Sequence, residues 1–438
     1  MQAGMYVYYV MGKDTMGTNA AGDHVVVVGG GVIGLCVAYY ALRSGKQVTI
    51  LEREPEGGDN CSAENAGMVV PSHFVPLAAP GMIALGLRWM LNPESPFSFS
   101  IRPALLRWAY LFWRHANRSH VEGCRSLLCG LNLKSRELFV ELSSEFDYGL
   151  VKRGLLMLCE KQQTLESEAL LAETAKGLGM EVEVCSASRL AEVDPDIDME
   201  VAGGVWFKED CHLNPHAFLS GLRERIAALG GNFRYDADVE GFTREAGKVK
   251  AVRIASGSSR ADEVDADQVV IAGGAWSPLL ARELGLSLPM ASGKGYSMTL
   301  EEPVQLPRVC SILTEARVAV TPIEGTLRFA GTMEIGGRNL AVNERRIRGI
   351  CKSVSRCFPR FAMQHFDGVN RWAGLRPCAP DGLPYIGPAG PGLGNVFIAT
   401  GHAMMGLSLA PVTGHLVAQL LGGGLPDIDI AKLAPARF

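Results

Sequence analysis

The feature that most constrains the fold is an apolar run, His24–Val28, that ends at a glycine cluster. Its four consecutive valines suit a strand buried on both faces, as in a parallel sheet covered by helices. Gly29, Gly31 and Gly34 then match G-x-G-x-x-G, the spacing at which such a strand turns tightly into a helix. The first N–H groups and the dipole of that helix can bind a pyrophosphate. The pattern therefore predicts the first strand and helix of a dinucleotide-binding unit.

A second apolar strand, Gln47–Leu51, is followed directly by Glu52. A carboxylate at this strand end accepts hydrogen bonds from ribose hydroxyls. The glycine motif alone has many accidental matches. Here, however, a strand, the glycines, a helix, a second strand and an acidic residue follow one another in the expected order, and this order favours a nucleotide-binding site over a purely structural turn. These residues do not distinguish NAD from FAD.

Length and composition narrow the classes of protein that fit. With 438 residues, of which 47% are hydrophobic, the chain is long enough for two cores, and we expect two joined domains. The formal net charge of −4 gives no indication of a nucleic-acid surface. The 11 cysteines include no C-x-x-C pair, so we expect no metal site, and reduced thiols in a cytoplasmic protein. Residues 1–23 lack the charge and apolar length of a secretory signal and are expected to form a flexible tail.

Residues 80–117 are rich in aromatic and basic side chains, and Pro93 and Pro96 divide them into two predicted helices. One interpretation is a peripheral membrane contact at the inner face of the cell membrane, with aromatic side chains in the headgroup region and arginines on anionic lipid. The alternative is a packed helical lobe of the second domain. Neither helix has the apolar length of a membrane span.

The C-terminal third carries the candidate chemistry. Arg376 stands in a segment of prolines and glycines, residues 374–387, where a side chain can be held in one direction. Residues 401–408 are predicted to open an apolar helix that runs to about residue 421, so that N–H groups at its start can face an acceptor oxygen. His402, in this segment, is either catalytic or a structural histidine of the core.

At this point the residues resemble a known family, the FAD-dependent D-amino-acid dehydrogenases of the D-amino-acid oxidase superfamily. The matching segments are 25–52, Ser62 with 65–67, 211–213, 272–277, 293–297, 374–377 with 380–382, and 400–402 with Gly406. The resemblance implies an α/β protein with a glutathione-reductase-type Rossmann FAD domain (24–76, 185–288 and 366–438). It also implies an interleaved substrate domain (77–184 and 289–365) built on a mostly antiparallel sheet flanked by helices.

The resemblance also implies roles for individual positions. The expected FAD contacts are Gly29, Gly31, Val32, Ile33 and Gly34 on the pyrophosphate; Glu52, Arg53 and Val239 on the adenosine; Ser62, Asn65, Ala66, Gly67 and Met68 along the ribityl chain and ring; Ala272, Gly273 and Trp276 beside the nucleotide; and Gly374, Gly401, Met404, Met405, Gly406, Leu407 and Ser408 at the ring. Arg376 would bind the substrate carboxylate with its planar fork. Tyr296 is a candidate second substrate contact, with a structural role as the alternative.

The implied activity is oxidation of a D-amino acid to the imine, and then to a 2-oxo acid and ammonia, by hydride transfer from Cα to flavin N5. Electrons would pass to a quinone, an electron-transfer protein or dioxygen. One alternative is a dehydrogenase or oxidase of 4-hydroxy-D-proline or another secondary amine, such as proline, sarcosine or glycine. Another is a flavin-binding subunit of a heteromeric complex. Related sarcosine oxidases carry a flavin-linked cysteine near the position of Gly374, and the glycine here predicts non-covalent FAD.

Overall fold

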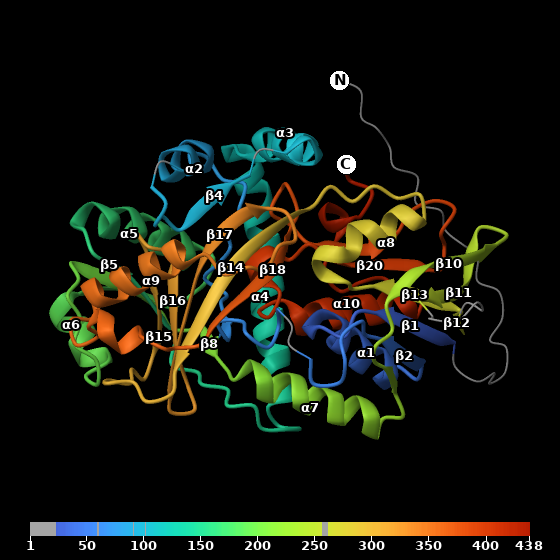
Figure 1. Cartoon of the computed structure of the whole chain (residues 1–438), viewed down its shortest axis with the longest axis horizontal. Helices are drawn as coiled ribbons and strands as arrows, with labels where there is room; N and C mark the ends of the chain where they lie inside the picture. Colours follow the sequence, from blue (N-terminus) through green and yellow to red (C-terminus); the bar gives the residue numbers. More distant parts are fainter. Residues whose placement is uncertain (1–22, 59–60, 91, 101, 256–261) are drawn as a thin grey trace.

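Two large sheets lie side by side in the computed structural model and define its two lobes (Figure 1). The structure describes residues 23–438 except 59–60, 91, 101 and 256–261. Residues 1–22 of the expected tail therefore lie outside the described residues. No helix in the described ranges is long and apolar enough to cross a membrane.

The first lobe is built on a six-stranded sheet that contains the glycine motif. Its strands, in spatial order, are β19 (Tyr385–Pro388), β20 (Val396–Thr400), β13 (Gln268–Ile271), β1 (His24–Val28), β2 (Gln47–Leu51) and β9 (Asn232–Arg234). All neighbours are parallel except β19, which is antiparallel to β20. The valines of β1 are buried on both faces, as the sequence predicted.

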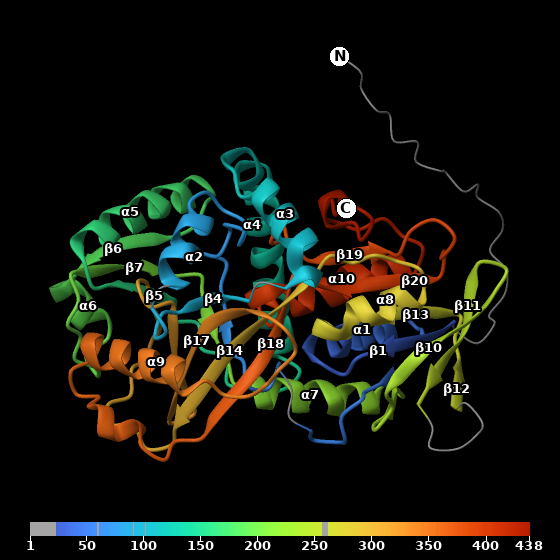
Figure 2. The same cartoon turned by 45° about the horizontal axis from the view of Figure 1, so that its top comes forward.

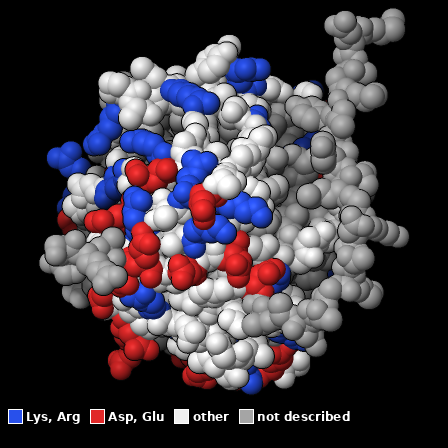
Figure 3. Space-filling view, turned by 90° about the vertical axis from the view of Figure 1, so that its right-hand side faces the viewer, with Lys and Arg blue, Asp and Glu red and all other residues white. Residues whose placement is uncertain are grey.

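Helices and a small sheet cover the two faces of this sheet. Along one face lie α1 (Val32–Arg43), α7 (Pro215–Ala228) and α10 (Ala410–Leu421). On the other face lie α8 (Ser277–Glu283) and a three-stranded meander, β10 (Val239–Glu245), β11 (Lys248–Ile254) and β12 (Asp262–Asp265). The end of the molecule that carries this meander shows basic and acidic side chains close together, without a surface of one sign (Figure 3).

The second lobe is built on a nine-stranded, mostly antiparallel sheet, as expected. Eight strands follow one another as β18 (Arg371–Cys378), β14 (Ala291–Leu300), β17 (Thr326–Gly336), β16 (Val318–Ile323), β15 (Cys310–Leu313), β5 (Leu155–Cys159), β7 (Gly203–Phe207) and β6 (Val182–Ser186); the ninth, β4 (Phe97–Phe99), pairs with β17. A separate short pair joins β3 (Met68–Val69) to β8 (Cys211–His212).

Alternating residues of the nine-stranded sheet enter different cores, as the pleat requires. Met157 of β5 belongs to the core shared with the first lobe, with α4 (Arg118–Leu142) and α5 (Gln162–Gly177). Leu156 belongs to the core under α6 (Ala187–Val193) and α9 (Glu344–Cys357). Figure 2 shows α3 (Leu106–His115) at the junction of the lobes and α2 (Met82–Met90) beside it, over the nine-stranded lobe.

The strand order shifts two of the expected domain boundaries. The sequence predicts residues 185–288 and 366–438 in the FAD domain, but β7 pairs with β5, and β18 pairs with β14. Both strands therefore belong to the nine-stranded sheet. Their apolar patterns resemble those of the first lobe, and only long-range pairing reveals which sheet they join.

Candidate functional site

A cavity of about 1030 Å³ lies between the two lobes and is lined by both sheets. Its wall includes the carboxyl ends of β1 and β2, where open α/β sheets bind ligands. Pockets for small molecules usually measure roughly 300–1,000 Å³. The cavity is therefore large enough to be shared by a long cofactor and a substrate.

The glycine turn lets the backbone of β1 and α1 approach this cavity closely. Gly29 has a φ of +114°, and a Cβ there would lie 2.6 Å from the carbonyl oxygen of Ala272. A Cβ on Gly34 would lie 1.9 Å from the carbonyl oxygen of Gly29. Side chains at both positions are excluded by backbone. The N–H of Val32 donates to Ser62 Oγ at 3.0 Å, which ties residues 61–68 to the start of α1.

The acidic residue after β2 lies directly beside the glycine turn. Glu52 accepts hydrogen bonds from the Gly30 N–H (2.6 Å) and the Glu54 N–H (3.0 Å). The guanidinium of the next residue, Arg53, lies 4.2 Å from the ring centroid of Trp276. Two expected adenosine contacts and one nucleotide contact thus meet at one end of the cavity.

A buried arginine that sequence reasoning missed holds residues 61–68 in place. Arg328 of β17 is 6% exposed and donates to the carbonyl oxygens of Ala63 (3.0 Å) and Asn65 (2.8 Å). It also lies 3.3 Å from Glu64. Gly67, with φ +75°, packs against the Leu213 carbonyl. The sequence offers one signal for this role, because Arg328 is the only charged residue in the apolar segment Leu327-Arg328-Phe329-Ala330.

Residues 401–408 differ from the expected helix start. A short 3-10 turn, Ala403–Met405, follows β20, and α10 begins only at Ala410. Within the described residues no acceptor is found for the N–H groups of Gly406 and Leu407, and both residues line the cavity. The donors therefore come from a turn and not from the first turn of a helix.

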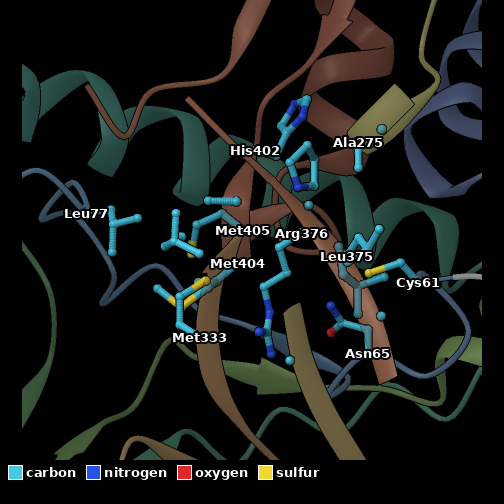
Figure 4. A pocket seen from close by; sticks show the side chains of 18 of the residues that line it. Cys61, Asn65, Leu77, Ala275, Met333, Leu375, Arg376, His402, Met404 and Met405 are labelled. Atoms are coloured by element: carbon cyan, nitrogen blue, oxygen red, sulfur yellow. The ribbon is translucent and has the colours of Figure 1, made fainter. Parts of the chain in front are cut away.

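Arg376 is the central cation of the cavity (Figure 4). It lies on β18, and its guanidinium crosses Gly295 of β14, where a Cβ would be 1.9 Å from Nη1. Nη1 donates to the Thr332 carbonyl at 2.7 Å. Burial lowers the pKa of Arg376, and no carboxylate in the described part of the chain pairs with it. A desolvated cation without an acid partner is suited to an anionic ligand.

The backbone partner of Arg376 is strained. Thr332 has a φ of +71°, which is rare for a β-branched residue. It stands where the β14–β17 pairing contains an extra residue, opposite the interval from Lys294 to Tyr296. This bulge directs a carbonyl at the guanidinium, and strain of this kind is concentrated at functional sites.

The placement of Tyr296 corrects its expected role. Tyr296 borders the cavity, but its side chain is buried in the core under α9 with Ile347 and Ile350. Its hydroxyl donates to Glu334 at 2.7 Å, and burial raises its pKa. Tyr296 and Gly295 are consecutive in β14, so their side chains point to opposite faces of the sheet, and Arg376 occupies the Gly295 face. The alternative interpretation, a structural tyrosine, describes this arrangement.

His402 is likewise held as a neutral core side chain. Thr413 donates its hydroxyl proton to the Leu409 carbonyl, so its oxygen accepts from His402 Nε2 at 3.0 Å. Burial lowers the pKa of His402 to about 3. The ring therefore stays uncharged near neutral pH and carries no proton to donate from Nδ1.

Most of the expected contacts come together at the cavity. Those that line it are Gly29, Gly31, Val32, Ile33, Glu52, Arg53, Ser62, Asn65, Ala66, Met68, Val239, Ala272, Gly273, Trp276, Gly374, Met404, Met405, Gly406 and Leu407. Gly34, Gly67, Gly401 and Ser408 are not among the lining residues; the Ser408 hydroxyl instead donates to Asn132 and accepts from the Val70 N–H.

These residues fit FAD on three observations. The glycine turn is a cradle that any Cβ at Gly29 or Gly34 would fill. The N–H groups of Gly406 and Leu407 are unpaired donors, within the described ranges, in the wall of the same cavity. Glu52 lies at the adenosine end. Pyrophosphate, ring carbonyls and ribose each have a suitable partner.

Comparisons with known proteins show which sequences and structures this chain is similar to. A family model described as FAD dependent oxidoreductase matches residues 24–420. The chain is 32% identical to a D-amino acid dehydrogenase of Xanthobacter autotrophicus (94% of this chain, 99% of the relative) and 32% identical to one of Methylobacterium radiotolerans (95% and 99%). Among solved structures, a glycine oxidase of Geobacillus kaustophilus superposes with a TM-score of 0.75 at 22% identity (95% and 99%). An L-proline dehydrogenase of P. horikoshii superposes with 0.71 at 19% (95% and 98%).

Proposed function

The chain belongs to the family of FAD-dependent oxidoreductases, and from this premise we propose that it oxidises D-amino acids and passes the electrons to a quinone or other carrier. The observation that carries the proposal is Arg376, a desolvated guanidinium without an acid partner among the described residues, in the cavity that also holds the glycine cradle. Its planar fork matches a carboxylate. The curated relatives named D-amino acid dehydrogenase support the choice of substrate class.

FAD, when bound, supplies the acceptor for the two electrons that leave the amino acid. The protein's part is to place the substrate. Arg376 binds the α-carboxylate, and the Thr332 carbonyl and the absence of a side chain at Gly295 fix the direction of the guanidinium. Met333, Met404 and Met405 lie together on one side of Arg376 (Figure 4) and line the same cavity. Oxidation of the C–N bond yields an imine, which water hydrolyses to a 2-oxo acid and ammonia.

None of the side chains near Arg376 in the described part of the chain is suited to remove a proton from the substrate. His402 is a weak base because burial lowers its pKa to about 3, and the Tyr296 hydroxyl faces Glu334. The substrate amine therefore has to be deprotonated before oxidation, and the protein contributes position and electrostatics more than acid–base catalysis.

Anaerobic reduction of the purified holoenzyme tests this function. D-amino acids should bleach the flavin absorbance, and the L-enantiomers should bleach it at least 100-fold more slowly. Sarcosine, L-proline and 4-hydroxy-D-proline form the comparison set, because a secondary-amine dehydrogenase would be reduced by these instead. A flavin that no compound of either set reduces would exclude both catalytic functions for this chain.

We expect the FAD to be non-covalent. Gly374 lines the cavity but offers no side chain for a bond, and a Cβ there would lie 1.9 Å from the Trp372 ring. Precipitation of the holoenzyme with trichloroacetic acid should leave the yellow colour in the supernatant. Flavin fluorescence that stays with the denatured chain on a gel would contradict this expectation.

We further propose that α2 and α3 contact the cytoplasmic face of a membrane, from which a lipid-soluble acceptor could be reached. Trp108 and Phe112 of α3 line the cavity, and the Trp108 indole donates to the Cys378 carbonyl at 2.8 Å. The outer side of α3 exposes Leu106 and Trp113, the latter by 64%. A helix that exposes apolar and aromatic side chains and also carries arginines is typical of a contact with the membrane interface.

Sedimentation with vesicles that contain phosphatidylglycerol measures this contact. Leu106→Ser with Trp113→Ser should lower the bound fraction several-fold, because the apolar area that enters the headgroup region is lost. Leu170→Ser, at a 73% exposed position on α5, is the matched control and should bind as the wild type does. Equal binding by all three proteins would argue against a membrane role for α3.

A further inference from the structure

The guanidinium of Arg376 ends beside an apolar face of the nine-stranded sheet. It crosses β14 at Gly295 and reaches β17, where Nη1 donates to the Thr332 carbonyl at 2.7 Å. The next residue of β17, Met333, lies on the same face, because a Cβ on Gly293 of β14 would be 2.3 Å from its sulfur. Figure 4 shows Met333 next to Arg376. A ligand held by the guanidinium therefore meets Met333 at once.

The short strand β4 extends this apolar face. It runs parallel to β17, with Phe97 opposite Met333 and Phe99 opposite Ile335. All four side chains line the cavity and pack in one apolar cluster. Neighbouring strands are ~4.8 Å apart, so the rings of β4 stand one strand spacing from the strand on which the guanidinium ends.

Helix α3 forms an aromatic wall over the same face. The Trp108 indole donates at 2.8 Å to the carbonyl of Cys378, two residues after Arg376 on β18. Its ring stacks with Phe99, at 6.4 Å between ring centroids, and with Phe112, at 5.1 Å. Trp108 and Phe112 both line the cavity. The wall thus connects the strand of Arg376 with β4.

Helix α2 packs on the other side of β4. A Cβ on Gly86 would lie 3.0 Å from the Phe97 ring, and the Trp89 ring lies 6.4 Å from it. The arginines at 88, 102 and 107 are not among the residues that line the cavity. The described residues between 82 and 113 that do line it are all apolar or aromatic: Met82, Ile83, Gly86, Leu87, Trp89, Met90, Pro96, Phe97, Phe99, Trp108, Ala109, Phe112 and Trp113.

We propose that Met333, Phe97, Phe99, Trp108 and Phe112 form an apolar pocket for the substrate side chain, and that this pocket selects large apolar or aromatic side chains. The inference rests on the proposed D-amino-acid oxidation, because that function places the α-carboxylate on Arg376. A phenyl or isobutyl group would bury its surface against Met333 and Phe97. An ammonium group or a second carboxylate would lose its hydration there without gaining a partner.

A substrate series on the wild-type holoenzyme tests the pocket. Anaerobic stopped-flow reduction at varied concentration gives a Kd for D-phenylalanine, D-leucine, D-alanine, D-glutamate and D-lysine. D-phenylalanine and D-leucine should bind at least ~10-fold more tightly than D-alanine, because their side chains leave water. D-glutamate and D-lysine should bind more weakly than D-alanine. D-alanine bound as tightly as D-phenylalanine overturns the pocket alone. A wild type that no D-amino acid reduces overturns the proposed function, and the pocket with it.

Matched variants locate this preference in the molecule. Phe97→Ala should reduce the Kd ratio of D-alanine to D-phenylalanine to less than about threefold, because the ring that the side chain packs on is lost. Phe233→Ala is the control: it truncates another half-buried phenylalanine of a three-residue edge strand, β9, away from the cavity lining, and should keep the wild-type ratio. Met333→Gln, which places an amide in the pocket, repeats the test if Phe97→Ala does not fold.

The same variants distinguish a substrate pocket from a binding site for the electron acceptor. A second mixing step with a short-chain quinone measures the reoxidation of the reduced enzyme. A lowered Kd ratio in Phe97→Ala or Met333→Gln supports the pocket. A wild-type ratio in a folded variant overturns it, and slower reoxidation in that variant would assign the apolar wall to the acceptor instead.

Discussion

Arg376→Met should lower the second-order rate constant of flavin reduction by a D-amino acid about 1,000-fold, which corresponds to about 4 kcal/mol. The loss is large because the guanidinium is desolvated, so its hydrogen bonds to the substrate carboxylate are not replaced by water. Methionine keeps the unbranched apolar stem of the arginine and removes its charge and its donors. FAD content should stay at the wild-type level, since all the expected FAD contacts except Gly374 lie on other segments of the cavity wall.

Two further variants define this experiment. Arg376→Lys keeps the charge but not the planar fork, and should recover only part of the activity. Arg371→Met changes another arginine of β18, whose ion pair is with Glu344 on α9, and should reduce at the wild-type rate. Arg376 loses its assigned role if Arg376→Met turns over as fast as Arg371→Met does.

Arg328→Met should weaken FAD binding about 100-fold and destabilise the protein by roughly 3–5 kcal/mol. The substitution leaves the carbonyls of Ala63 and Asn65 without their buried donor, and Glu64 keeps only His216 as a partner. Residues 61–68, which carry the expected ring contacts, would then be free to move away from the Val32 N–H. Titration of the apoprotein with FAD, followed by flavin fluorescence, measures the affinity, and thermal denaturation measures the stability.

An exposed arginine is the control for this variant. Arg360 pairs with Asp198 at the surface, with 70% of its side chain exposed, and Arg360→Met should change stability by less than about 1 kcal/mol. Arg328→Lys can reach only one of the two carbonyls at a time and should fall between the wild type and Arg328→Met. Wild-type FAD affinity in Arg328→Met would show that the loop is held without the arginine.

The features that the sequence predicted correctly are those set by neighbouring residues. The valines of β1, the glycine turn and Glu52 follow one another closely, and a side chain at Gly34 is excluded by the carbonyl of Gly29 in the same turn. The nucleotide-binding lobe could therefore be predicted. The start of α10 could not, because the unpaired donors of residues 406–407 belong to a turn that resembles a helix in composition.

The sequence by itself predicted the turn from strand to helix at Gly29 and Gly34, where the structure leaves no room for a Cβ. Only the tertiary structure decided what Arg328 clamps, which sheet β7 and β18 join, and which carbonyl holds Arg376. The tertiary structure also showed that the Tyr296 side chain lies on the face of β14 opposite to Arg376, where its hydroxyl bonds to Glu334. Each of these depends on pairing between distant strands, where a shift of one residue reverses the face that a side chain occupies.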